Sequence, residues 1–253
     1  MAHTLNNACR HNPLWGIVVV IQRVYLDESA SECPFLVSGW MARSDRWDSF
    51  SEKWQEILNA EPKIDYFSLN DALGLKGPFH GWKGAERDRK IIALAKVIPH
   101  DGTICGTGCY VQREVFEKNK QRIRRPIYRE PYYFCVATTM IFMVKGEYQV
   151  VGADKIDFVL DRSRAAERMT ELFYSQIRPL SPKLGECLTL NDRETMPLQA
   201  ADLSVGMTRQ LYEPSPRRIP GSYSLTGLFS AVFEIHSKGL EDAIASPLFS
   251  GSP

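Results

Sequence analysis

The 253-residue sequence lacks the features that mark membrane, secreted or strongly polyanion-binding proteins. Its apolar run at residues 14–21 is too short to span a bilayer, and no basic segment with a cleavage site accompanies it. The six cysteines form no CxxC pair and lie partly in apolar runs, so we expect reduced, buried thiols. The formal net charge is only +1, so any affinity for nucleic acid must come from local clusters of Lys and Arg. We expect a soluble cytoplasmic protein with no membrane partner.

The sequence also lacks internal repeats and low-complexity tracts. With 44% hydrophobic residues, its length suits one large α/β domain. From residue 213 the chain becomes rich in Pro, Ser and Gly, and its one strong apolar cluster is Phe229, Val232, Phe233 and Ile235. We therefore expect a domain over residues 1–212 and an extension over residues 213–253 that packs on it.

Apolar periodicity predicts an α/β chain with a mixed sheet flanked by helices. The expected strands cover residues 15–27, 34–41, 103–112, 155–161 and 186–190, and the first two are joined by a turn at residues 27–33. The expected amphipathic helices cover residues 44–58, 85–97, 163–177 and 197–211. Residues 131–144 are almost uniformly apolar, which predicts a buried central helix packed against the sheet.

Three acids lie where the surrounding sequence predicts burial. Asp27 follows the first strand, Asp161 ends a later strand, and Asp202 lies in an apolar helical run. An isolated carboxylate is costly to bury unless a cation, several hydrogen bonds or a metal compensates it. Because functional groups collect at strand ends in α/β sheets, we expect the three acids to converge on Mg²⁺ or Mn²⁺. The alternative is that each acid is only a turn residue or a helix cap.

Two further groups are candidates for substrate binding. Gln199 shares a helical face with Asp202, so it either binds a ligand or simply adds polarity to the helix surface. Residues 118–129 carry a basic cluster without an acid, and tyrosines lie within and after it; this suits phosphate contacts and base stacking on single-stranded nucleic acid, or a solvated basic loop. The candidates chosen for substrate binding are Gln199, Lys120, Arg122, Arg124 and Arg125.

Three blocks resemble the hallmark segments of the domain-of-unknown-function 3800 family. They are Tyr25-Leu26-Asp27-Glu28-Ser29, Val159-Leu160-Asp161 and Pro197-Leu198-Gln199-Ala200-Ala201-Asp202-Leu203. The resemblance covers roughly residues 17–207 and implies a ribonuclease H-like fold and a metal-dependent nuclease, with the acids at 27, 161 and 202 matching the family's. The chain departs from the family's usual residues at Ala30, Ser68 and Arg193, which leaves the three acids in place.

A fourth metal ligand is usual in the superfamily that the resemblance implies. Glu28 is the first candidate and is counted with the three acids among the catalytic residues, ahead of Asp192 and Glu194. Because side chains alternate along a strand, Glu28 suits this role only if the strand ends before it.

Three functions follow from these observations. The first is a two-metal nuclease, in which ions about 3.5–4 Å apart activate water and neutralise the leaving oxygen of a DNA or RNA phosphodiester. The second is a non-catalytic module of the same fold that binds nucleic acid or protein. The third is a metal-dependent phosphatase that acts on small esters.

Overall fold

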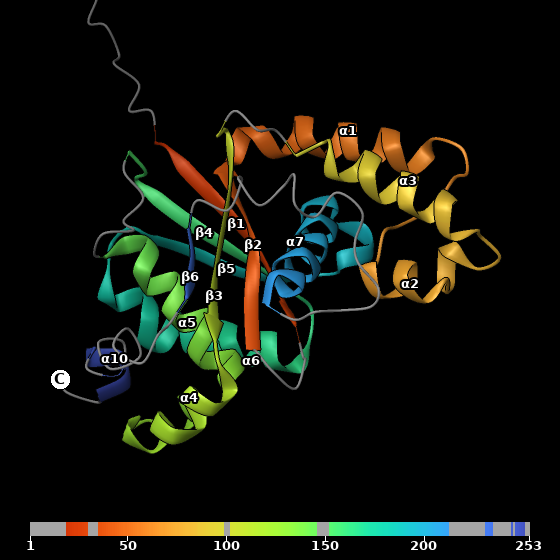
Figure 1. The fold of residues 1–253 in the computed structure, drawn as a ribbon. Coiled ribbons are helices and arrows are strands. Elements are labelled where there is room, and N and C mark those ends of the chain that lie inside the picture. The colour runs from red at the N-terminus through yellow and green to blue at the C-terminus, as the bar shows by residue number, and fades with distance from the viewer. Residues whose placement is uncertain are drawn as a thin grey trace, which may run out of the picture.

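The computed structural model describes residues 19–29, 35–98, 102–145, 152–212, 231–234, 244 and 246–250. Their centre is a six-stranded mixed sheet in the order β5-β4-β1-β2-β3-β6 (Figure 1). The strands are β1 (Ile21–Ser29), β2 (Phe35–Arg43), β3 (Ile104–Val111), β4 (Lys155–Asp161), β5 (Leu184–Leu190) and β6 (Ala231–Glu234). Strands β1, β2 and β3 pair antiparallel, whereas β4 runs parallel to β1, β5 parallel to β4 and β6 parallel to β3. The expected α/β class is confirmed.

Helices cover both faces of this sheet (Figure 1). One face packs against α1 (Trp47–Asn59), α2 (Leu69–Gly74), α3 (Gly84–Ala95) and α7 (Met196–Tyr212). The other packs against α4 (Arg113–Asn119), α5 (Pro131–Val144), α6 (Arg164–Leu172) and α10 (Pro247–Ser250). None of the described helices is long and apolar enough to cross a membrane.

Alternation along β1 produces the two cores. Val24 and Leu26 are buried against the α5 layer, whereas Tyr25 is buried against the α7 layer. On the α7 side, the Trp40 indole N–H donates to the carbonyl of Ala200 at 2.8 Å, which fixes the helix across the centre of the sheet. The α7 face is the one on which the candidate acids meet.

Most of the expected elements are found, and the helix at residues 131–144 and the strand at residues 155–161 have the expected bounds. The first strand differs, because it continues through Asp27 and Glu28 to Ser29 instead of turning at Asp27. The backbone of these residues still pairs with β2, so the turn begins later than expected. Residues 15–18 and 30–34 of the expected strand and turn lie outside the described residues.

Part of the expected C-terminal extension belongs to the sheet. Residues 231–234 form β6, which pairs with β3, and the Phe249 ring packs 4.8 Å from that of Phe134 on α5. Phe229, Ile235 and most of residues 213–253 lie outside the part that the structure describes. The four cysteines within that part, at positions 105, 109, 135 and 187, are free thiols, and three of them are buried.

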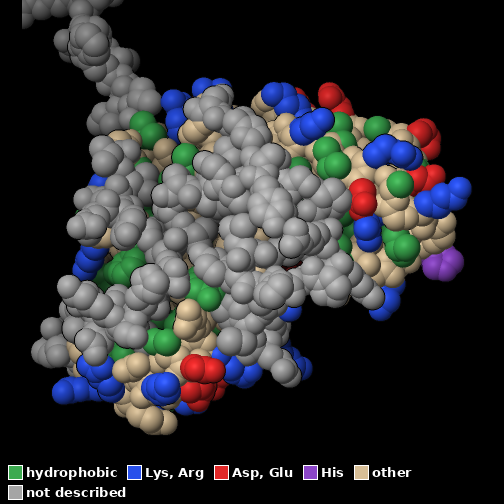
Figure 2. Space-filling view, in the orientation of Figure 1, with side chains coloured by type: hydrophobic (Ala, Val, Ile, Leu, Met, Phe, Trp, Pro, Cys, Tyr) green, Lys and Arg blue, Asp and Glu red, His purple; other side chains and the backbone are tan. Residues whose placement is uncertain are grey.

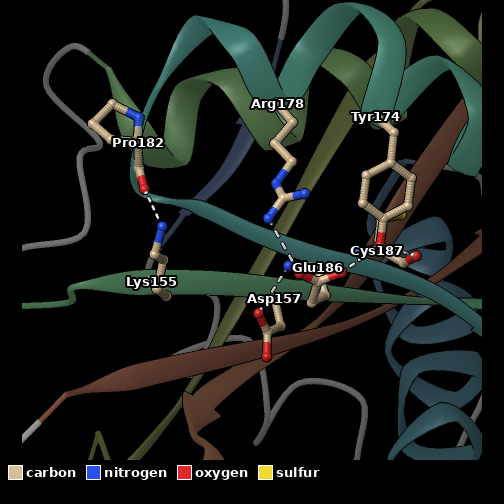
Figure 3. A network of polar contacts seen from close by, with 7 residues as sticks. All are labelled: Lys155, Asp157, Tyr174, Arg178, Pro182, Glu186 and Cys187. Atoms are coloured by element: carbon tan, nitrogen blue, oxygen red, sulfur yellow. Dashed lines mark hydrogen bonds and ion pairs between the residues drawn. The ribbon is translucent and has the colours of Figure 1, made fainter.

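A polar network holds the edge strand β5 against β4 and against residues 173–180, which follow α6 (Figure 3). The Asp157 carboxylate accepts a hydrogen bond from the backbone N–H of Glu186 at 3.0 Å. The Glu186 carboxylate in turn accepts from the hydroxyl of Tyr174 at 2.6 Å and lies 3.2 Å from the guanidinium of Arg178. These contacts fix the strand whose end leads into the turn before α7.

Candidate functional site

Two of the predicted acids are neighbours across the β1 and β4 ladder. Leu26 pairs with Leu160 in parallel register, so the residues that follow, Asp27 and Asp161, lie on adjacent strands about 4.8 Å apart. Tyr25 and Val159, two residues before Asp27 and Asp161 respectively, are buried on the α7 face. Because side chains alternate along a strand, both carboxylates point to that same face.

The third acid comes from the helix that covers this face. Asp27 pairs with Ser38 on β2, and the Ser38 hydroxyl lies 2.8 Å from that of Ser204 on α7. Asp202 lies two residues before Ser204 on this helix, and its charge is the second cause, after burial, of the raised pKa of Asp27. The structure brings the three predicted acids together from β1, β4 and α7.

One oxygen of each acid is anchored by the backbone. Asp27 Oδ1 accepts from the N–H of Glu28 at 2.8 Å, and Asp202 Oδ2 accepts from the N–H of Leu69 at 2.7 Å. Asp161 Oδ1 accepts from the N–H groups of Arg162 at 2.8 Å and Asp192 at 3.2 Å. No described residue donates a hydrogen bond to the second oxygen of any of the three. Each acid is thus oriented through one oxygen and retains another for a ligand.

The acids share an environment that disfavours negative charge. Burial, followed by the charges of Asp202 and Glu28, raises the pKa of Asp27 well above its ordinary value. Burial also raises the pKa of Asp202 to about 7, with additional contributions from Asp192, Asp161 and Asp71. The pKa of Asp161 is raised by burial and then by Asp192. Among the described residues, no Lys or Arg forms an ion pair with these carboxylates.

Two more acids border the site. Asp192 lies on the turn before α7, donates its N–H to Asp161, and raises the pKa of both Asp161 and Asp202. From the sequence, Asp192 is predicted only as a candidate for the fourth ligand that ranks behind Glu28. Asp71, which sequence reasoning missed, accepts a hydrogen bond from the Tyr66 hydroxyl at 3.1 Å and also raises the pKa of Asp202. Its position depends on the packing of α2 against α7, which no sequence spacing reveals.

Glu28 does not meet the condition set for it as the fourth ligand. Because β1 continues to Ser29, alternation directs Glu28 away from Asp27 and toward α5, where its charge contributes to the raised pKa of Tyr132. Burial, followed by the charge of Asp161, raises the pKa of Glu28 itself to about 7. Glu28 therefore borders the three acids from the other face of the sheet. Glu194, the last candidate, is exposed on the turn before α7.

Gln199 is better explained as a structural residue than as a substrate contact. Its side chain is fully buried. The amide oxygen accepts from the indole N–H of Trp54 at 3.0 Å and from the backbone N–H of Phe67 at 3.1 Å, and the amide nitrogen donates to the carbonyl of Asp192 at 3.0 Å. All of these partners belong to the protein, so the predicted substrate contact is not supported.

The basic segment at residues 118–129 begins at the same edge of the sheet as the acids. It follows the carboxyl end of β3, which runs in the same direction as β1 and β4. Figure 2 shows Lys and Arg side chains around α4, at the lower end of the molecule. This segment packs in the α5 layer, so the acids and the basic segment share an edge of the sheet but lie on different faces.

The four basic candidates differ in their contacts. Lys120 forms an ion pair with Glu117 at 2.6 Å, and Arg125 donates to the side chain of Gln176. Arg122 donates to Asn119 at 3.1 Å, and Arg124 is exposed. Arg122 and Arg124 are exposed, whereas Lys120 and Arg125 are half-buried, so the first two are more accessible to a ligand.

The donor set of the acid cluster fits a hard divalent cation. Carboxylate oxygens are the ligands that Mg²⁺ and Mn²⁺ prefer, and no Lys or Arg in the described ranges forms an ion pair with them. Within those ranges, however, no three His, Cys, Asp or Glu side chains are already arranged as a metal-binding group.

The comparisons with known proteins leave this site to be interpreted from its own chemistry. No protein-family model, curated protein or solved structure matches the chain.

Proposed function

We propose that the protein is a metal-dependent nuclease, in which Asp27, Asp161 and Asp202 hold Mg²⁺ or Mn²⁺. The observation that carries this proposal is the meeting of three carboxylates from β1, β4 and α7, each with one oxygen anchored by a backbone N–H and the other without a described donor. Raised pKa values in a group of acids that form no ion pair with a described Lys or Arg favour a site that binds a cation.

The proposal includes a ribonuclease H-like fold and membership of the domain-of-unknown-function 3800 family. Three antiparallel strands followed by two strands parallel to β1, in the order β3-β2-β1-β4-β5, are compatible with that fold. The blocks that carry the family resemblance are also the segments that place the acids, at the ends of β1 and β4 and in α7.

In this proposal, some residues bind the metal ions and others orient the ligands. Asp27, Asp161 and Asp202 supply oxygen ligands, and Asp192 is the nearest candidate for a fourth. The backbone donors to the anchored oxygens orient these ligands, as hydrogen bonds around metal ligands commonly do. When bound, the metal ions supply an activated water and offset the charge on the leaving oxygen of a phosphodiester.

Nucleic acid is the substrate that the surrounding charge favours. A polyanion approaching carboxylates needs positive charge nearby, and the basic segment at residues 118–129 begins at the same edge of the sheet. Arg122 and Arg124 are the members of that segment that we assign to backbone phosphates.

A second candidate function is a non-catalytic module that binds nucleic acid or protein. The observation that favours it is that, within the described part of the chain, no three His, Cys, Asp or Glu side chains are arranged to hold a metal ion. In that case, binding would persist in the presence of a chelator and would depend on the basic segment rather than on the acids.

Cleavage of labelled single-stranded and duplex DNA and RNA, with Mn²⁺ or Mg²⁺, tests the proposal. The native chain should cut at least one substrate, and Asp202→Asn should lose that activity, because the amide can still accept from the N–H of Leu69 but is a poor metal ligand. Asp45→Asn is the matched control, because Asp45 is an exposed partner of Arg43 away from the acids. Metal-independent binding without cleavage by any of these chains would favour the second function, and turnover of small phosphate esters alone would identify a phosphatase.

A further inference from the structure

We propose that Arg193, held against the ring of Tyr66, binds a backbone phosphate of the nucleic acid beside the acid cluster. This inference depends on the proposed function and adds a substrate-binding residue to the same site. It concerns a different face of the sheet from the basic segment at residues 118–129.

The first observation is the way in which Arg193 is held. Its guanidinium carbon lies 4.7 Å from the centroid of the Tyr66 ring, which is a cation–π contact. Arg193 is exposed, and no described carboxylate lies within ion-pair distance of it. Stacking on a ring fixes the plane of a guanidinium without using its N–H donors.

The second observation is the position of this pair beside the acids. The Tyr66 hydroxyl donates to Asp71, and Arg193 directly follows Asp192. The charges of Asp71 and Asp192 both raise the pKa of Asp202 and the pKa of Tyr66. The Tyr66 and Arg193 pair therefore lies at the border of the acid cluster.

The third observation is that one buried amide fixes both halves of the pair. The Gln199 side chain accepts from the N–H of Phe67, next to Tyr66, and donates to the carbonyls of Asp192 at 3.0 Å and Arg193 at 3.4 Å. Gln199 lies one helical turn before Asp202, whose carboxylate accepts from the N–H of Leu69. Tyr66 and Arg193 are thus held at a defined place relative to Asp202.

These features together suit a phosphate. An arginine among several acids would ordinarily pair with a carboxylate, whereas Arg193 stacks on Tyr66 and keeps its donors available to an incoming anion. The planar guanidinium matches two phosphate oxygens, and the positive charge lowers the repulsion between the acids and a polyanion. A backbone phosphate near the reacting bond is the anion that this place accommodates.

The test is the salt dependence of binding of a short labelled single strand, in Ca²⁺ and with the strand shown to stay intact. Arg193→Ala should weaken binding about tenfold. It should also lower the slope of log K against log salt by about 0.7, the value of one phosphate contact on a single strand. Arg193→Lys should keep the slope and bind less tightly than the native chain, because its ammonium retains the charge but lacks the planar fork.

Arg43→Ala is the matched control. Arg43 is an exposed arginine at the carboxyl end of β2, which runs antiparallel to β1, so it lies at the opposite edge of the sheet from the acids. This variant should keep both the affinity and the slope. Unchanged affinity and slope in Arg193→Ala would overturn the inference, as would an equal loss in Arg43→Ala.

Cleavage kinetics separate this inference from the proposed function. If the native chain cleaves and Arg193→Ala has an unchanged KM, the inference fails and the nuclease stands. If no chain cleaves but Arg193→Ala alone loses the salt-dependent binding, the nuclease fails and the phosphate contact stands. Tyr66→Ala should reproduce the loss of affinity and Tyr66→Phe should not, because only the first removes the ring.

Discussion

The Asp161 carboxylate accepts a hydrogen bond from the backbone N–H of Asp192 at 3.2 Å, across 31 residues of sequence. This contact ties the end of β4 to the turn that precedes α7. It places the charge of Asp192 next to Asp161. Burial is the largest cause of the raised pKa of Asp161, and the charge of Asp192 is the second. The charges of the acids in the candidate site therefore interact, and a substitution that removes one charge changes the pKa of its neighbours.

Asp27→Asn should stabilise the metal-free protein and remove its response to metal. The amide relieves the repulsion between Asp27 and Asp202, and about 1 kcal/mol of relief corresponds to a rise in Tm of about 2–4 °C for a chain of this size. Thermal melts at pH 8 with and without Mn²⁺ measure both effects. A lower Tm, or an undiminished shift with Mn²⁺, would contradict the coupling.

The metal-free protein should lose stability as the pH rises from about 5 to 8. The pKa values of Asp202 and Glu28 are raised to about 7, so in this range the folded state binds more protons than the unfolded state. The stabilisation by these protonated carboxyls is complete below their unfolded pKa near 4 and is lost as the pH passes their folded pKa. Melts across this range, repeated with Mn²⁺, should show a larger metal-induced shift at pH 8 than at pH 5.5, and a shift independent of pH would argue against ionised acids as ligands.

Gln199→Ala should destabilise the fold by about 2–4 kcal/mol, because it leaves buried partners unsatisfied and opens a cavity. Gln55→Ala is the control: Gln55 makes one hydrogen bond to Asn59 on the exposed side of α1 and should cost little. Urea denaturation measures both. Equal, small losses would restore Gln199 as a candidate for a ligand contact.

The fourth ligand can be identified by comparing two amide substitutions. Asp192→Asn should reduce metal-dependent cleavage at least about tenfold, a loss in the range reported for groups around metal sites. Glu28→Gln should change it by less than about threefold, because Glu28 lies on the α5 side of β1 and Asp192 lies beside Asp161. A larger loss of cleavage in Glu28→Gln than in Asp192→Asn would instead support Glu28 as the fourth ligand, as the sequence predicts.

The sequence predicts the elements better than the contacts between them. Alternation in β1 and β4 and the uniformly apolar α5 are local patterns, so those elements and the acids at positions 27, 161 and 202 can be read from the chain. The end of β1 was missed because the pairing of Asp27 and Glu28 with β2 overrides their turn propensity. Contacts between distant segments were not predictable, because the bonds of Gln199 to Phe67 and of Asp192 to Asp161 exist only once α7 packs on the sheet.

The position of Mn²⁺ in crystals of the native chain grown at pH 8 tests the central claim most directly. Anomalous scattering should place at least one Mn²⁺ in contact with Asp27, Asp161 and Asp202, through the oxygens that accept no backbone hydrogen bond. Crystals of Asp202→Asn should show a weaker peak or none there. A native structure in saturating Mn²⁺ with no ion on these carboxylates would contradict the account.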